Sequence, residues 1–147
     1  VSQTRGTGPD QIPVLVVRDR TGETADFILP KINATEISRV LKPLIAKDAC
    51  LCTDGASVYR AFARSTGIEH QTVSARRPRT RGAFHIQNVN AYDSRLKCWM
   101  IRFHGVATKY LKNYLGWRRL LERYDDLTPE HCLLEATGRA SQQLIGT

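Results

Sequence analysis

The chain has 147 residues, of which 41% are hydrophobic, and its formal net charge is +8. This length suits one domain with a buried core, and this composition excludes an intrinsically disordered chain. No apolar run approaches the roughly 20 residues that a helix needs to cross a bilayer. We also expect no export signal, because no charged-then-apolar leader opens the sequence.

The excess of positive charge favours a polyanionic partner. The chain has 22 Lys and Arg residues against 14 Asp and Glu residues. A basic surface attracts nucleic acid at long range and gains affinity from the counterions that binding releases. The alternative is a soluble basic protein whose charge has no specific partner. The clustering of arginines described below favours nucleic acid.

The cysteines predict buried thiols and argue against a structural zinc site. No paired C-x-x-C motif is present among the four cysteines. Cys50 and Cys52 alternate within an apolar run, and Cys98 falls in a predicted helix. We therefore expect reduced, buried side chains in a reducing cytosol.

The first elements of the chain predict a β-hairpin. Residues 1–11 are rich in Gly, Pro and polar residues and predict a loop or a loose arm. The near-continuous β-branched run Ile12–Asp19 is typical of a strand that is buried on both faces. A tight turn follows, and Thr24–Pro30 predicts the partner strand.

An amphipathic helix is predicted next, over Asn33–Ala46. Its apolar residues recur at spacings of three and four, as on one face of a helix. Thr35 is the plausible N-cap, and Pro43 is expected to bend or shorten the helix because proline lacks a backbone N–H.

The rest of the chain predicts two more strands and four helices. In order they are a strand Cys50–Asp54, a helix Ala56–Gly67 that stops at its glycine, a strand His70–Ser74, a basic loop Ala75–Gly82, a long helix from about His85, a helix from about Val106 to Arg123, and a helix from Pro129 to about Leu144. Strands connected by helices predict an α/β fold, in which helices flank a mixed sheet.

An acidic residue ends the third predicted strand. Asp54 closes the run CLCTD and is followed at once by Gly55. In open α/β sheets, ligand sites lie just beyond the carboxyl ends of the strands, so this carboxylate is well placed to hold a cation. The alternative is a turn residue whose side chain caps the following helix.

A polar stripe follows one side of the long helix. Asn90, Asp93 and Lys97 are spaced by three and four residues, which places them on one face. An apolar stripe beside it is expected to face the core, and it consists of Val89, Tyr92, Leu96, Trp99, Met100 and Phe103. On helical spacing alone, solvated surface is the simpler interpretation of the polar stripe.

The spacing between Asp54 and the polar stripe resembles a known catalytic pattern. Residues 55 through 89, 35 in all, separate Asp54 from Asn90, and Lys97 follows seven residues after Asn90. This resembles the DD(35)E transposases and retroviral-type integrases of the ribonuclease H-like superfamily. More closely, TDGASVYRAF, HIQNVNAYDSRLKCWM and RFHGVATKYLKNYLGWRR are similar to insertion-sequence transposases in which Asn replaces the final acid and a Lys follows. The resemblance extends from about Val14 to Leu121.

The resemblance implies one ribonuclease H-like catalytic domain over residues 1–147 that lacks its first strand. In the family, that strand carries the first catalytic Asp. Neither Asp10, in a turn-like context, nor Asp19 and Asp26, in the predicted hairpin, occupies its position. We therefore expect a chain that is truncated at its amino terminus, or one that derives from a truncated element.

The same resemblance implies a two-metal site for Mg²⁺, or Mn²⁺, in the complete protein. Asp54 would hold metal as a carboxylate, and Asn90 would offer a neutral carbonyl oxygen. Because two-metal sites hold their ions about 4 Å apart, we expect the side chains of Asp54 and Asn90 to converge within about 4 to 7 Å. Lys97 would contact a DNA phosphate as a point charge, with a solvated surface lysine as the alternative.

A basic cluster precedes the long helix and is expected to bind the DNA backbone. It consists of Arg76, Arg77, Arg79 and Arg81, and the alternative is solvated charge on a loop. His85, which opens the predicted helix, is expected to join this phosphate contact, with a helix cap or surface histidine as the alternative. The resemblance implies double-stranded DNA as partner, at transposon ends and target. It further implies a homodimer or larger synaptic assembly in the nucleoid-associated cytoplasm of a bacterium.

Three functions remain open at this point. The first is the catalytic domain of a DNA transposase, with Mg²⁺-dependent strand cleavage and strand transfer at insertion-sequence ends. The second is a catalytically inactive fragment that acts as a DNA-binding or assembly module. The third is a related Mg²⁺-dependent nuclease or resolvase. The quoted segments favour the transposase, while the missing first Asp favours the inactive fragment.

Overall fold

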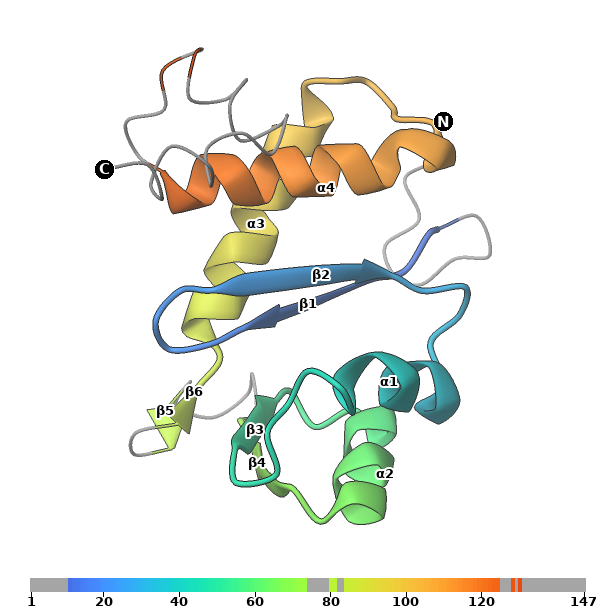
Figure 1. Cartoon of the computed structure of the whole chain (residues 1–147), viewed down its shortest axis with the longest axis vertical. Coiled ribbons are helices and arrows are strands. Elements are labelled where there is room, and N and C mark those ends of the chain that lie inside the picture. The colour runs from blue at the N-terminus through green and yellow to red at the C-terminus, as the bar shows by residue number, and fades with distance from the viewer. Residues whose placement is uncertain (1–10, 74–79, 82–83, 125–127, 129, 131–147) are drawn as a thin grey trace, which may run out of the picture. The chain divides into compact units, whose positions relative to one another are not determined.

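Ten helices and strands follow one another along the described part of the chain (Figure 1). The computed structural model describes residues 11–73, 80–81, 84–124, 128 and 130. The elements are β1 (Val14–Arg18), β2 (Thr24–Ile28), α1 (Ala34–Leu41), β3 (Cys50–Thr53), α2 (Ser57–Thr66), β4 (Glu69–Thr72), β5 (Thr80–Arg81), β6 (Phe84–His85), α3 (Gln87–Ile101) and α4 (Thr108–Arg123). They divide between two units, Val1–Thr108 and Lys109–Thr147. The single domain predicted from the sequence stays a prediction.

The predicted hairpin is present, with β1 and β2 paired antiparallel. Asp19 closes the turn, because its Oδ1 accepts hydrogen bonds from the backbone N–H groups of Thr21 and Glu23, both at 2.9 Å. Burial of the first strand on both faces was too strong a prediction. Leu15 is the one β1 residue that is fully buried, and the other four are half-buried.

Each face of the hairpin is nevertheless covered in part. Leu15 belongs to the main hydrophobic core on one face. On the other face, α3 contacts β1. The Tyr92 hydroxyl of α3 donates to Asp26 Oδ2 at 3.4 Å, and the Arg18 guanidinium lies 5.5 Å from the centre of the Tyr92 ring.

The helix predicted over Asn33–Ala46 is shorter than expected and has a different cap. Asn33 is the N-cap, since its side chain accepts a hydrogen bond from the Glu36 backbone N–H at 2.8 Å. Thr35, the cap predicted from the sequence, lies inside the first turn. Helix α1 ends at Leu41, as expected from Pro43, because proline has no backbone N–H to continue the helical hydrogen bonds.

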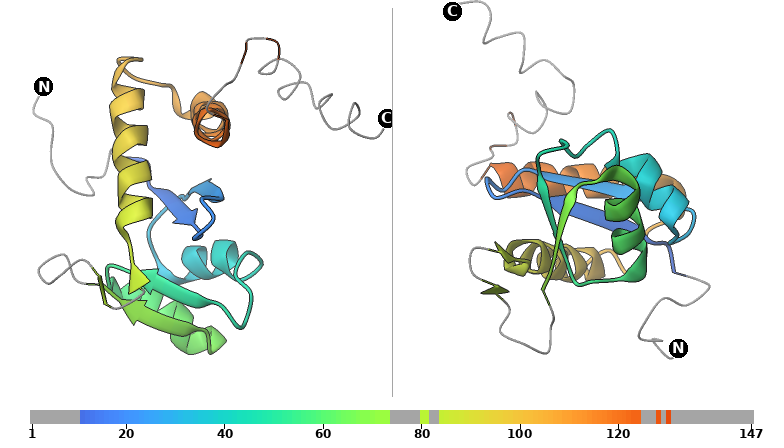
Figure 2. Two further views of the ribbon diagram at one scale, coloured as in Figure 1. Left: turned by 90° about the vertical axis from the view of Figure 1, so that its left-hand side faces the viewer. Right: turned by 90° about the horizontal axis from the view of Figure 1, so that it is seen from below.

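The next three elements form a parallel strand pair joined by a helix. β3 and β4 run parallel, with Cys50 opposite Glu69 and Thr53 opposite Thr72. Figure 2 shows the two strands side by side, with α2 against them. The predicted stop is confirmed: Gly67 has a φ of 72° and its N–H donates to the Ala63 carbonyl. Glycine reaches this left-handed geometry without steric cost.

One hydrophobic core joins the hairpin to the elements around α2. Its fully buried members are Leu15, Leu29, Ile37, Val40, Leu41, Phe62 and Ile68. Helices α1 and α2 contact each other across this core (Figure 1 and Figure 2). The amphipathic pattern of α1 therefore predicted its buried face, which consists of Ile37, Val40 and Leu41.

The described strands make a mixed α/β structure without one continuous sheet. They form three two-stranded sheets, β1–β2, β3–β4 and β5–β6. The predicted mixture of parallel and antiparallel pairing is confirmed, because β3–β4 is parallel and the other two pairs are antiparallel. The single mixed sheet is not seen, since neither β1 nor β3 has a second partner among the described strands.

The segment around the basic cluster differs from its prediction. Residues 80–81 were predicted as loop but form β5, which pairs with β6. His85 lies in β6 and does not open the long helix, which begins two residues later at Gln87.

The two long helices after this segment are confirmed, as α3 and α4, and the helix predicted from Pro129 to Leu144 lies outside the described residues. No described helix is long and apolar enough to span a membrane.

Candidate functional site

Asp54 follows directly after the last residue of β3 and is exposed. Its Oδ1 accepts a hydrogen bond from the Ala56 backbone N–H at 3.2 Å. Ala56 is the N-cap of α2, and no side chain caps that helix. Asp54 thus shapes the strand-to-helix turn but does not act as a side-chain cap of α2. Its other carboxylate oxygen makes no hydrogen bond within the described residues.

Gly55 allows this turn to pass close to β4. Its φ is +89°, in the region that residues with a Cβ rarely adopt. A Cβ placed on Gly55 would lie 2.4 Å from Thr72 Cγ2, closer than non-bonded atoms approach. Backbone conformation and close approach to β4 therefore both require glycine immediately after Asp54.

The buried hydroxyl of Thr53 also stabilises this turn. Thr53 is buried, and its Oγ1 accepts a hydrogen bond from the Gly55 backbone N–H at 3.0 Å. The same oxygen lies 2.8 Å from Nε2 of His70, on β4. The network links the strand end that carries Asp54 to the neighbouring parallel strand. The contact between Thr53 and His70 was not predicted from the sequence. It depends on the parallel pairing of β3 with β4, which only the structure shows.

Burial and charge perturb two ionisable groups near this turn. Burial, and then the positive charge of Arg60, lower the pKa of His70 below its usual 6.5. His70 is therefore neutral at pH 7. Burial, and then the negative charge of Asp54, raise the pKa of the Tyr59 hydroxyl.

The polar stripe of α3 is present and faces away from the core stripe. Asn90 and Lys97 are exposed, and Asp93 is half-buried. The apolar stripe is confirmed as a core face, with Tyr92, Leu96 and Trp99 buried. The stripe residues thus lie on one side of the helix, as their spacing predicts.

Within that stripe, Lys97 and Asp93 form an ion pair one turn apart. Both side chains remain substantially exposed, at 73% for Lys97 and 40% for Asp93. Exposed pairs of this kind contribute only about 0.2–1 kcal/mol. This weak pair therefore holds neither Lys97 nor Asp93 firmly.

Asp54 and Asn90 make no hydrogen bond to each other among the described residues. Their convergence within about 4 to 7 Å stays a prediction. The same part of the chain holds no group of three or more His, Cys, Asp or Glu side chains placed to bind a metal. The donors themselves suit Mg²⁺, because a carboxylate with a free oxygen and an amide carbonyl are hard oxygen ligands.

The predicted DNA-binding cluster is described only in part. Arg76, Arg77 and Arg79 lie outside the described residues. Arg81 and His85 belong to β5 and β6, where Arg81 is opposite Phe84 and His85 is opposite Thr80. Their contact with phosphate stays a prediction, and for His85 it no longer rests on a helix start.

The prediction of buried thiols was too strong, because none of the three described cysteines is fully buried. Cys50 and Cys52 are half-buried, while Cys98 is exposed on α3. Cys98 falls next to Lys97 and outside the apolar stripe, so the helical pattern already placed it off the core. Burial, together with neighbouring Cys52 and Glu69, raises the pKa of Cys50 to about 11.

An α/β unit with an exposed carboxylate after a parallel strand suits the DDE class of transposases, which the sequence motifs resemble. Comparison with protein families supports this class, since residues 1–118 match the model of the ISXO2-like transposase domain. The match covers most of the chain, and the protein belongs to this family. Searches of curated proteins and of solved structures found no match.

Proposed function

We propose that this chain provides the catalytic residues of a DNA transposase that cleaves and joins strands at insertion-sequence ends. The observation that carries the proposal is the position of Asp54. Its carboxylate is exposed immediately beyond the carboxyl end of β3, in a turn that Gly55 and Thr53 hold in one conformation. Membership of the transposase family makes phosphodiester bonds the natural substrate of such a carboxylate.

The hairpin and the β3–β4 pair would belong to one ribonuclease H-like sheet. Two observations support this. β1 pairs only with β2 and β3 only with β4 among the described strands, so each leaves an edge for another strand. In addition, Leu15 of β1 shares a single core with Phe62 and Ile68 around α2. A further strand between β1 and β3, carrying the first Asp, would complete both the sheet and the catalytic set.

Asp54 and Asn90 would hold Mg²⁺ or Mn²⁺, and Lys97 would contact a phosphate. Bound divalent cations relieve the negative charge that develops on the leaving oxygen of a phosphodiester. Asn90 contributes an oxygen without charge, so its loss should weaken metal binding less than the loss of Asp54. Lys97 neutralises a phosphate once the DNA displaces Asp93 from their exposed ion pair.

Metal titration tests this assignment directly. Calorimetry with Mg²⁺ and Mn²⁺ would compare the unmodified chain with Asp54→Ala and Asn90→Ala. Asp48→Ala is the matched control, because Asp48 is also exposed and lies in the turn before β3. We expect binding to be lost in Asp54→Ala, weakened in Asn90→Ala and unchanged in Asp48→Ala. Equal binding by Asp54→Ala and the unmodified chain would refute the assignment.

A catalytic readout follows from the same variants. In a version of the chain that also carries the strand with the first Asp, nicking of supercoiled plasmid in the presence of Mn²⁺ should depend on Asp54 and not on Asp48. Absence of metal binding in every variant would instead favour the DNA-binding or assembly module. That alternative draws on a specific observation, since the described residues hold no carboxylate cluster that could bind metal without a further strand.

A further inference from the structure

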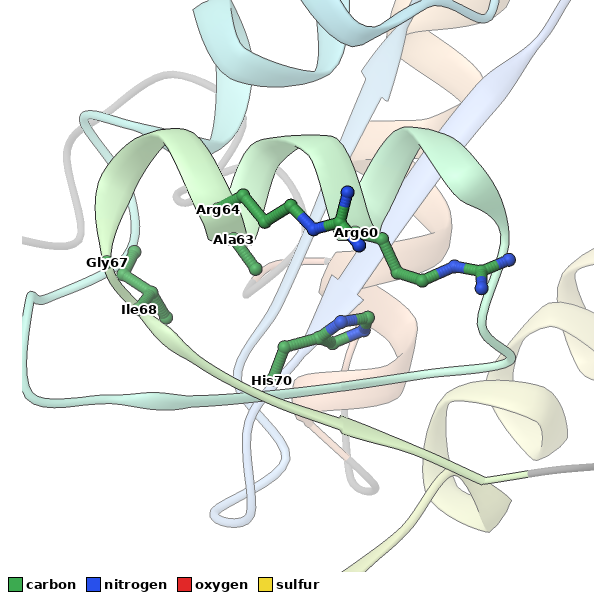
Figure 3. Close-up of a pocket in the computed structure, with 6 residues that line it drawn as sticks. All are labelled: Arg60, Ala63, Arg64, Gly67, Ile68 and His70. Atoms are coloured by element: carbon green, nitrogen blue, oxygen red, sulfur yellow. The ribbon is translucent and has the colours of Figure 1, made fainter.

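A shallow basic hollow lies between α2 and β4. Its volume is about 300 Å³. It is lined by Arg60, Ala63, Arg64, Gly67, Ile68 and His70. Figure 3 shows the two arginine side chains extending from α2 above the His70 ring, which points toward them from β4. No acidic side chain lines the hollow.

The two arginines of the hollow have no partner inside the described part of the chain. Arg60 and Arg64 are exposed, and neither guanidinium makes an ion pair or a hydrogen bond there. They lie one helical turn apart, where like charges repel each other and destabilise a helix. Helix α2 therefore holds two cations one turn apart that no carboxylate of the described residues pairs with.

Helix stability accounts for one of these arginines but not for the other. Arg64 lies in the last turn of α2, where the helix dipole favours a positive charge. Arg60 is the fourth residue of the helix and gains no such benefit. Its guanidinium also disfavours protonation of the adjacent His70. Arg60 thus repels Arg64 without a compensating gain in helix stability, and an anion in the hollow would relieve this repulsion.

His70 supplies a third group to the same hollow. Its Nε2 is engaged with Thr53 Oγ1 at 2.8 Å, while Nδ1 has no hydrogen-bond partner within the described residues. When the Thr53 hydroxyl donates a hydrogen bond to Nε2 of a neutral His70, the ring carries its own proton on Nδ1. It can then donate to an anion without needing a positive charge.

The floor of the hollow permits close approach by a ligand. Apart from the two arginines and His70, the hollow is lined by small or buried residues, Gly67, Ala63 and Ile68. A Cβ placed on Gly67 would meet no atom within 4 Å, which leaves the end near α2's last turn open. An open hollow with two forked cations suits a phosphate that is carried on a larger molecule.

We propose that this hollow binds a phosphate of the DNA backbone, as a contact separate from the residues assigned to metal and catalysis. The choice of DNA rests on the proposed function. Arg60 and Arg64 each present a planar fork to phosphate oxygens, and His70 donates from the opposite wall. The Thr53 hydroxyl links His70 to the turn that carries Asp54, so DNA held here would be anchored to the same strand pair as the catalytic carboxylate.

The experiment is a salt-dependent DNA-binding titration without divalent metal. Fluorescence anisotropy would follow a labelled duplex with the unmodified chain and with the double variant Arg60→Gln plus Arg64→Gln. Loss of one phosphate contact should flatten the slope of log affinity against log salt by about 0.9, and affinity at low salt should fall about tenfold. Unchanged slope and affinity would overturn the proposal.

A charge-matched control separates a local contact from general attraction. Lys42→Gln plus Lys47→Gln removes the same two charges from exposed positions at the end of α1 and the turn after it. We expect this control to reduce affinity by less than about threefold and to leave the slope within about 0.3 of the unmodified value, because no counterion-releasing contact is lost. An equal loss of DNA affinity in both double variants would show that only net charge matters and would refute a phosphate site in the hollow.

Nuclear magnetic resonance identifies the ligand and its place. The His70 ring signals should shift on addition of duplex and should not shift in the Arg60→Gln plus Arg64→Gln variant. Inorganic phosphate at millimolar concentration is the second probe. If phosphate shifts His70 but duplex does not, the site takes free phosphate and the DNA proposal fails. Asp54→Ala should retain the duplex-induced shift, so failure of the metal assignment and failure of this site are distinguishable.

Discussion

Replacement of Gly55 by alanine tests how tightly the turn after Asp54 is held. At φ +89°, a Cβ costs about 1–2 kcal/mol in backbone energy. The new Cβ would also lie 2.4 Å from Thr72 Cγ2, which must rotate away at about 0.5–1.5 kcal/mol. We therefore expect Gly55→Ala to lower the free energy of unfolding by about 1.5–3.5 kcal/mol.

Two further variants separate the backbone cost from the contact. Gly67 also has positive φ, but nothing lies within 4 Å of the Cβ that alanine would add there, so Gly67→Ala should carry the backbone cost alone. Thr72→Ser removes Cγ2, and the next nearest Thr72 atoms, Cβ and Oγ1, are at 3.6 and 3.7 Å, which is ordinary contact. Combined with Gly55→Ala, it should restore about 1 kcal/mol.

Urea unfolding followed by circular dichroism measures these differences. With a denaturant slope of about 2 kcal/mol per molar, 1 kcal/mol corresponds to a midpoint shift of about 0.5 M. The midpoint should fall furthest for Gly55→Ala and recover in the double variant with Thr72→Ser. Equal midpoints for Gly55→Ala and Gly67→Ala, with no recovery, would refute the close packing of the turn against β4.

Three other predictions concern the cap of α1, a thiol and a histidine. Asn33→Ala should cost about 1 kcal/mol in urea unfolding because it removes the cap of α1, whereas Thr35→Ala should cost little. Iodoacetamide at pH 8, followed by mass spectrometry, should label exposed Cys98 well before Cys50, whose pKa of about 11 leaves almost no thiolate; equal rates would contradict this. Because the folded pKa of His70 is lowered, its contribution to stability is complete above pH 6.5 and is lost as pH falls through the folded pKa. The unfolding midpoint should therefore drop between pH 7 and pH 5, and His70→Gln should show a smaller drop.

Elements whose pattern is local were predicted well from the sequence. The hairpin, the parallel strands and the long helices follow from β-branched runs, helical spacing and the stop at Gly67. The core faces of α1 and α3 followed from the same periodicity. Local patterns failed where two residue types compete for one role. Asn33 and Thr35 both suit an N-cap, and the choice between them depends on the entry angle of the chain.

The parts of the site that depend on distant contacts were less predictable. Sequence spacing led to Asp54 and to the stripe of α3, because each is a local feature of a strand end or a helix face. It did not include the ion pair that Asp93 forms with Lys97. Nor did it find His70, whose hydrogen bond with Thr53 joins residues 17 apart in the sequence and depends on how β3 and β4 pair.

The turn at Asp54 is held by interactions that need no metal, and this bears on how the carboxylate should be probed. Thr53 and Gly55 fix the backbone through a buried hydroxyl and a glycine conformation, and neither involves the Asp54 side chain. Only one carboxylate oxygen contributes to the turn, through the Ala56 N–H. An asparagine at this position keeps that acceptor while it removes the charge. Asp54→Asn should therefore preserve the turn and remove only the negative charge. Asp54→Ala removes both the charge and the hydrogen bond to the Ala56 N–H.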